Sequence, residues 1–133
     1  MAGNAHLIQL IQPEDVAPPG GHYSHAVVAN GFVFVSGQLP ITADGQRLTQ
    51  ASFATQTRQT LANLAATLKA AGTDIQHLVQ IRVYLDTIEN WPEFNTLYAE
   101  WAAESRPARA IIPTAPLHFG LKIEIEATAL LPH

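Results

Sequence analysis

The chain has 133 residues, seven Lys and Arg against eleven Asp and Glu, a formal net charge of −4 and no cysteine. This length predicts one domain over residues 1–133, and the lack of cysteine excludes a disulfide framework, a thiol nucleophile and a thiolate metal site. Because the basic residues are few and form no run, we expect no nucleic-acid partner.

The N-terminal third predicts short strands joined by tight turns. A first strand is expected at 6–12, and two β-rich runs follow at 23–29 and 32–36. Asn30-Gly31 separates these runs, and this pair favours a type I′ hairpin because both central residues need positive φ. Ala43-Asp44-Gly45 indicates a second turn.

From about residue 50 to 71 the apolar residues recur at steps of three and four, which predicts an amphipathic helix. Gly72 has the position of a C-terminal capping residue. The expected apolar stripe consists of Phe53, Thr57, Leu61, Leu64 and Leu68.

The rest of the chain alternates between strand and helix patterns. A strand is expected at 79–85, a second helix from about Asn90 with Pro92 in its first turn, and two strands at 108–113 and 122–130. The order predicts an α+β fold with a mostly antiparallel sheet and two helices packed on one face.

Two features indicate that part of the surface is buried against another copy of the chain. Charged residues make up 14%, against about 25% in ordinary domains, and the segments 32–35 and 110–112 are apolar at consecutive positions. The alternative is that Gln, Thr, Asn and His replace charged residues on a solvated surface. Two helices cover only one sheet face, so the composition favours a homo-oligomer.

No targeting or membrane signal is visible. Residues 1–6 lack the basic and apolar regions of a signal peptide, and no apolar stretch approaches the roughly 18 residues that span a bilayer. We therefore expect a cytoplasmic protein with no membrane partner.

The segment 122–129 carries two carboxylates on one strand. The period of two places Glu124 and Glu126 on one face, with Ile123 and Ile125 on the other. Either the pair is an exposed, charged surface, or one carboxylate faces a cleft and handles a proton or a water molecule.

Arg109 begins an apolar strand, where it is either a surface residue or a guanidinium that grips a carboxylate in two-point fashion. His22 and His25 form an H-x-x-H pair, but a step of three in a strand sends the two rings to opposite faces, so a metal site is not expected. No phosphate-binding loop is present, which argues against a nucleotide cofactor.

Taken together, these segments resemble the RidA (YjgF/YER057c/UK114) family, in the family's order and over most of the chain. The closing pair of motifs is the most specific part. The matching stretches are 34–40 (FVSGQLP), 58–64 (RQTLANL), 94–98 (FNTLY), 107–109 (PAR) and 122–127 (KIEIEA).

The resemblance implies a chorismate-mutase-like subunit in a homotrimer, with pockets at the subunit interfaces. It also implies hydrolytic deamination of enamines and imines, such as 2-aminoacrylate and 2-imino acids, to 2-keto acids and ammonia without a cofactor. The substrate would be a small carboxylate-bearing imine or enamine. Residues carried over by the resemblance are Arg109 for the substrate carboxylate, Glu124 for water activation, Tyr23 as a pocket lining, and Ser36 and Gly37 as pocket wall.

Three departures from the family pattern affect the expected pocket. His22 precedes Tyr23 where the family often has proline, Ile111 stands where a cysteine is common, and His118-Phe119-Gly120 replaces a turn that usually bears lysine and aspartate. Isoleucine serves at 111 if that position acts through backbone groups; if the size of the side chain shapes the pocket, the substrate preference differs from that of the family. The alternatives to a deaminase are a non-catalytic ligand-binding trimer and an endoribonuclease or translation inhibitor.

Overall fold

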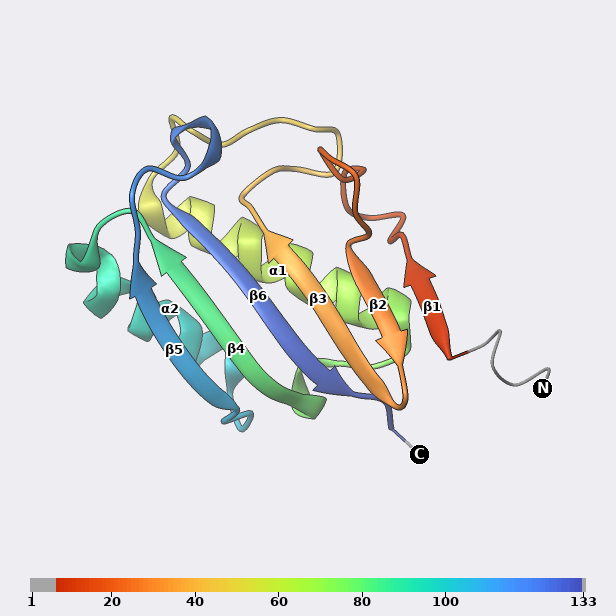
Figure 1. The fold of residues 1–133 in the computed structure, drawn as a ribbon. Coiled ribbons are helices and arrows are strands. Elements are labelled where there is room, and N and C mark those ends of the chain that lie inside the picture. The colour runs from red at the N-terminus through yellow and green to blue at the C-terminus, as the bar shows by residue number, and fades with distance from the viewer. Residues whose placement is uncertain (1–6, 133) are drawn as a thin grey trace.

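A computed structural model describes residues 7–132 and contains a six-stranded sheet in the order β1-β2-β3-β6-β4-β5 (Figure 1). The elements are β1 (Ile8–Ile11), β2 (Ala26–Ala29), β3 (Phe32–Gln38), α1 (Phe53–Ala71), β4 (Leu78–Leu85), α2 (Trp91–Ala102), β5 (Ala108–Pro113) and β6 (Ile123–Leu130), with 3-10 turns at Ile75–His77, Ile88–Asn90 and His118–Gly120.

The sheet is antiparallel at every strand pair except β4–β5, which is parallel. The connection between β4 and β5 passes through α2, as a parallel pair requires. Both helices lie behind the sheet in Figure 1, and α1 runs across β2, β3 and β6. The expected class, a mostly antiparallel sheet with two helices on one face, is therefore confirmed.

The Asn30-Gly31 hairpin is confirmed by positive φ at both residues, 51° and 83°. β2 nevertheless begins at Ala26 rather than at Tyr23, and the side chain of His25, just before the strand, is buried. Its Nε2 donates to the carbonyl of Ala17 at 2.6 Å, and its Nδ1 accepts from Gln38 Nε2 at 3.1 Å. Both ring nitrogens are thus bonded within the chain. The expected strand at 6–12 is shorter, and His6 lies outside the described residues.

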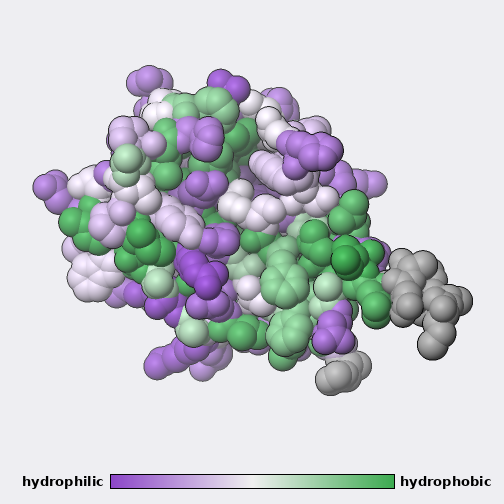
Figure 2. All heavy atoms as spheres, viewed as in Figure 1, coloured by the Kyte–Doolittle hydropathy of each residue, from purple (hydrophilic) through white to green (hydrophobic). Residues whose placement is uncertain are grey.

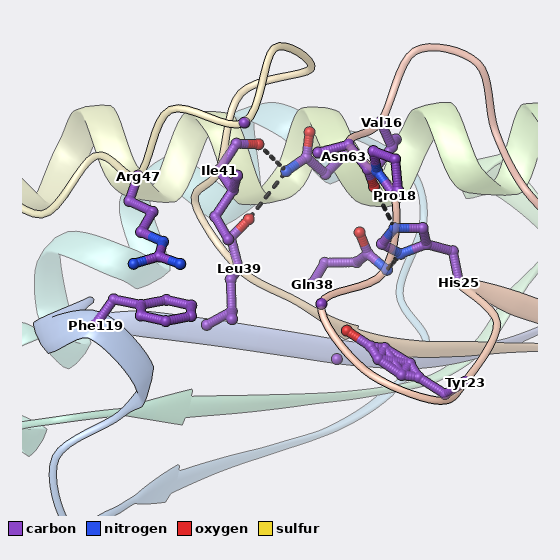
Figure 3. Close-up of a pocket in the computed structure, with 14 residues that line it drawn as sticks. Val16, Pro18, Tyr23, His25, Gln38, Leu39, Ile41, Arg47, Asn63 and Phe119 are labelled. Atoms are coloured by element: carbon purple, nitrogen blue, oxygen red, sulfur yellow. Dashed lines mark hydrogen bonds between the residues drawn. The ribbon is translucent and has the colours of Figure 1, made fainter.

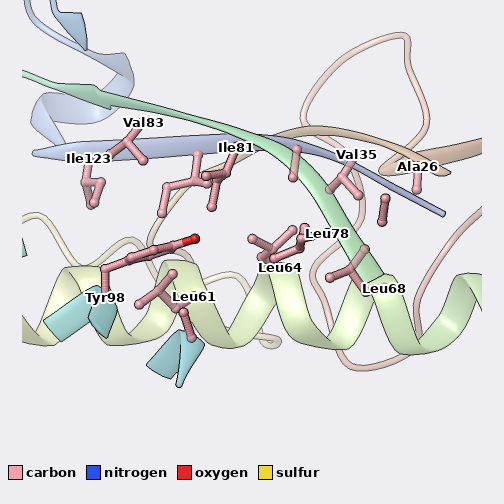
Figure 4. Packing of buried hydrophobic residues seen from close by; sticks show 14 of the residues in the cluster. Ala26, Val35, Leu61, Leu64, Leu68, Leu78, Ile81, Val83, Tyr98 and Ile123 are labelled. Atoms are coloured by element: carbon pink, nitrogen blue, oxygen red, sulfur yellow. The ribbon is translucent and has the colours of Figure 1, made fainter. Parts of the chain in front are cut away.

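The helix α1 carries the main core contacts, as its apolar stripe predicts. Ser52 caps its first turn by accepting from Thr55 N, and Gly72 ends it at φ 94°. Every member of the stripe is buried, and side chains from β4 and β6 pack onto it (Figure 4). Their inward residues alternate with outward ones, so that Ile81, Ile123 and Ile125 are fully buried.

The opposite sheet face is open and partly apolar. Ile8 and Leu10 of β1 and Phe32 and Phe34 of β3 are 37–68% exposed, and Figure 2 shows hydrophobic side chains gathered over β1 to β3. Such a contiguous apolar area is typical of a protein-protein contact. None of the helices within residues 7–132 has the combination of length and apolar character needed to cross a bilayer.

Candidate functional site

A cleft of about 460 Å³ lies at the end of β3, beside the first residues of β6. Its volume falls in the range typical of small-ligand sites. It brings together four of the residues expected at the site, although they come from three separate parts of the chain: Tyr23, Ser36, Gly37 and Glu124.

Gly37 makes room for the carboxylate of Glu124. The β3–β6 register shifts between Val35 and Gln38, and this bulge brings the backbone of residues 36 and 37 against β6. A Cβ at position 37 would lie 2.9 Å from Glu124 Cδ and closer still to Oε2. Only a glycine leaves the carboxylate in this place.

Glu124 has the environment of a reactive carboxylate. Its side chain is about half buried, and loss of solvation raises the pKa of its carboxyl group above the ordinary value; the nearby positive potential of His118 opposes this rise, and the charge of Glu126 adds to it. No hydrogen bond from residues 7–132 occupies the Glu124 carboxylate. It is therefore free to bind water or a ligand.

Glu126 lies on the same face but is occupied by the protein. The hydroxyl of Tyr84 donates a hydrogen bond to Glu126 Oε1, and this bond is the main cause of the raised pKa of Tyr84. Arg82 stands directly opposite Glu126 in the sheet register. The two carboxylates of 122–129 thus differ: Glu124 faces the cleft, whereas Glu126 belongs to a polar network on the sheet surface.

Tyr23 and Ser36 form the other side of the cleft. The Ser36 hydroxyl donates to the carbonyl of Ser24 at 2.6 Å, which holds the loop before β2 against β3. Tyr23 is about half exposed, and its ring meets that of His25 edge-on, with centroids 6.3 Å apart (Figure 3). One contact of Tyr23 is thus with a buried, hydrogen-bonded ring.

Arg109 and Ile111 do not join this cleft within one chain. Glu124, Tyr84 and Ile112 are partners across three strands and point to one sheet face. Arg109 is three residues from Ile112 and so points to the other face. Its guanidinium carbon lies 5.2 Å from the ring centroid of Tyr98 on α2, at the edge strand. Ile111 packs against the core.

The cleft also contains residues that the sequence did not single out as site residues. Phe119 and His118 line it, and the guanidinium carbon of Arg47 lies 3.5 Å from the ring centroid of Phe119 (Figure 3). The departure from the family pattern at 118–120 could have indicated that His118 and Phe119 belong to the site. Arg47 follows the turn at 43–45, and no sequence motif marks it as a site residue.

The sequence model of the family described as Endoribonuclease L-PSP matches residues 14–131 of this chain. Among named relatives, a RutC family protein of Pyrococcus horikoshii is 36% identical over 91% of this chain and 96% of its own length. The human 2-iminobutanoate/2-iminopropanoate deaminase is 34% identical over 83% of this chain and 80% of its own length.

Solved structures resemble the fold closely. RidA from the Antarctic bacterium Psychrobacter sp. PAMC 21119 superposes with a TM-score of 0.88 at 30% identity, covering 92% of this chain and 99% of that one. TdcF of E. coli, solved with bound serine, gives a TM-score of 0.87 at 26% identity, with 93% and 99% coverage. These similarities extend over almost the whole of each chain.

Proposed function

The chain belongs to the RidA (Endoribonuclease L-PSP) family, and from that premise we propose that it hydrolyses reactive 2-imino acids and their enamine tautomers to 2-keto acids and ammonia. The observation that carries this proposal is Glu124: a half-buried carboxylate in a cleft, without a partner among the described residues. A human relative that bears the name of such a deaminase supports the same reaction class.

The proposed reaction needs one water molecule and no cofactor, because an imine carbon is already electrophilic. Glu124 accepts a proton from the water as its oxygen adds to the imine carbon, and the C=N π electrons move to nitrogen. The proton held by Glu124 then passes to that nitrogen, which gives a carbinolamine with one hydroxyl and one amino group on the same carbon. Glu124 next takes the hydroxyl proton and delivers it to the amino group, so that the C–N bond breaks and ammonia leaves. The carbon retains the oxygen as the carbonyl of the 2-keto acid.

We assign the substrate carboxylate to Arg109 of a second copy, in a homotrimer with its sites between subunits. The guanidinium lies at the exposed edge of the sheet, on the face opposite to Glu124, so one chain supplies only half of the site. The backbone groups of Ile111 would contribute to the site at the same edge of the sheet. The apolar area over β1 to β3 supports such an assembly. Residues 1–133 of each copy would act as one domain.

The proposal is tested with Glu124→Gln, which keeps the shape of the side chain but cannot accept a proton. An amino acid oxidase supplies the imine, and semicarbazide traps whatever the protein has not hydrolysed. We expect the variant to lose about 10²–10⁴-fold in turnover. Binding of the stable product 2-oxobutanoate, measured by calorimetry, should change little, because Arg109 is intact.

Glu126→Gln is the matched control, since Glu126 lies about 7 Å farther along the same strand and already accepts from Tyr84. It should turn over imine nearly as fast as the wild type. Binding of 2-oxobutanoate without any hydrolysis by the wild type would overturn the proposal in favour of a non-catalytic binding protein.

A further inference from the structure

Arg47 lies beside the proposed reaction site and makes no ionic contact with the residues that the structure describes. The only ion pair within residues 7–132 joins Asp74 and His77, so no carboxylate of the described chain lies within 4 Å of the Arg47 guanidinium. One face of this group covers the ring of Phe119. Stacking uses the face of a guanidinium and leaves the N–H donors at its edge available to an anion.

The hollow that contains Arg47 is continuous with the cleft of Glu124. Tyr23, Gly37 and Phe119 line both spaces, and so does an apolar wall of Leu39 and Ile41, whose side chains lie beside Arg47 and Phe119 in Figure 3. A ligand whose reacting carbon lies at Glu124 can therefore extend methylene groups along this wall toward the guanidinium.

The backbone of Arg47 is held in place by the fold. Asn63 of α1 donates from Nδ2 to the carbonyls of Leu39 and Ile41, each at 2.9 Å. Ile41 in turn forms an isolated β-bridge with Arg47. The loop that carries Arg47 is thereby fixed to α1, so the exposed Arg47 side chain starts from a fixed backbone position and rests on the ring of Phe119.

Phe119 is fixed as well, in an unfavourable backbone conformation. Its φ and ψ are 61° and 17°, the left-handed region that bulky side chains rarely adopt. Thr49 Oγ1 donates to the Phe119 carbonyl at 2.9 Å and helps to hold it there. Phe119 lines both the cleft of Glu124 and the hollow of Arg47, and backbone strain of this kind concentrates at ligand-binding sites.

We propose that Arg47 binds an anionic group on the substrate side chain and that this protein prefers dicarboxylic 2-imino acids, such as the imine derived from glutamate. The inference rests on the proposed function, because it assigns the side-chain end of the same site. Arg109 of the second copy takes the carboxylate next to the imine, and Arg47 takes the distal one. Leu39 and Ile41 contact the methylene groups between them.

The test compares imines derived from glutamate and from 2-aminobutyrate in the semicarbazide competition assay. Wild-type protein should have the higher kcat/KM for the glutamate-derived imine. Arg47→Gln should reduce the ratio of the two kcat/KM values about tenfold or more, the effect of losing a hydrogen bond to a charged group. Arg47→Lys should keep part of the preference, and Arg58→Gln, a guanidinium lost from α1 outside the cleft, should change neither value.

Calorimetry with 2-oxoglutarate and 2-oxobutanoate separates this inference from the proposed function. If the wild type hydrolyses neither imine, yet Arg47→Gln selectively weakens 2-oxoglutarate, the deaminase proposal fails and the anion site stands. If both imines are hydrolysed and Arg47→Gln leaves the kcat/KM ratio and the 2-oxoglutarate affinity as in the wild type, the inference about Arg47 is wrong. Unchanged binding of 2-oxobutanoate shows that the variant is folded.

Discussion

Gly37→Ala is the smallest change that moves the proposed catalytic carboxylate. The added Cβ would lie 2.9 Å from Glu124 Cδ, whereas carbon atoms in contact are about 3.5–4.0 Å apart. The end of the Glu124 side chain must therefore shift by roughly 0.5–1 Å. A misplacement of this size lowers turnover by about 10²-fold when geometry decides the rate.

The same substitution should leave the fold almost unaffected. Gly37 does not have a left-handed φ, and the atoms that the new methyl group meets belong to the end of a flexible side chain. Replacing glycine by alanine at a compatible backbone also restricts the unfolded chain, which contributes about 0.4–1 kcal/mol of stability. We expect the free energy of unfolding to stay within about 1 kcal/mol of the wild type.

Imine trapping and urea unfolding, carried out on the same preparations, measure the two effects. Gly21→Ala is the matched control: Gly21 lines the same cleft, but a Cβ there meets no atom within 4 Å and so displaces no side chain. Full imine hydrolysis by a folded Gly37→Ala protein would refute the reasoning, since it would show that the position of the Glu124 carboxylate does not determine the rate.

Three further predictions follow from the site. Arg109→Ala should lose roughly 2–5 kcal/mol of 2-oxobutanoate binding free energy. Arg109→Lys should also bind 2-oxobutanoate poorly, because an ammonium group lacks the two parallel N–H donors of a guanidinium. Wild-type affinity of either variant in calorimetry would assign Arg109 to the surface. Hydrolysis should fall as pH falls through the raised pKa of Glu124. The negative charge of Glu126 raises this pKa and the positive charge of His118 lowers it, so the acidic limb of the pH profile should move to lower pH in Glu126→Gln and to higher pH in His118→Gln. Unchanged pH profiles would contradict the assignment of Glu124. Light scattering should give about three times the 14.4 kDa chain mass, and a monomer at micromolar concentration would exclude a site between subunits.

Local chemistry accounts for the parts of the fold that the sequence predicted well. Asn30-Gly31 allows only a few turn types, and the stripe on α1 between Ser52 and Gly72 combines period with end caps. The sequence predicts the start of β2 too early, because a β-rich composition does not show where strand pairing begins. The hydrogen bonds of the His25 ring with Ala17 and Gln38 are likewise contacts that no local pattern indicates.

The candidate site could be predicted only in part, because its decisive contacts are long-range. The period of two placed both glutamates on one face, but which of them faces a cleft depends on the bulge at Gly37 and on Tyr84. The Arg47–Phe119 stack joins two loops that are far apart in the sequence. Thr49, which lies on the same loop as Arg47, is 70 residues from Phe119. The face of Arg109 follows from the pairing of β5 with β4, which its own segment does not determine.

The central claim, a hydrolytic site built from two chains, is tested most directly by mixing two inactive variants. Arg109→Ala and Glu124→Gln proteins are unfolded together, refolded as an equal mixture and assayed for imine hydrolysis. With random assembly, the chain that supplies Arg109 to a site has an intact Arg109 in half of the cases, and the chain that supplies Glu124 has an intact Glu124 in half of the cases. Both are intact in about a quarter of the sites, so about a quarter of the wild-type activity should return. If the mixed trimers stay as inactive as either variant alone, Arg109 and Glu124 do not meet across subunits and the account is wrong.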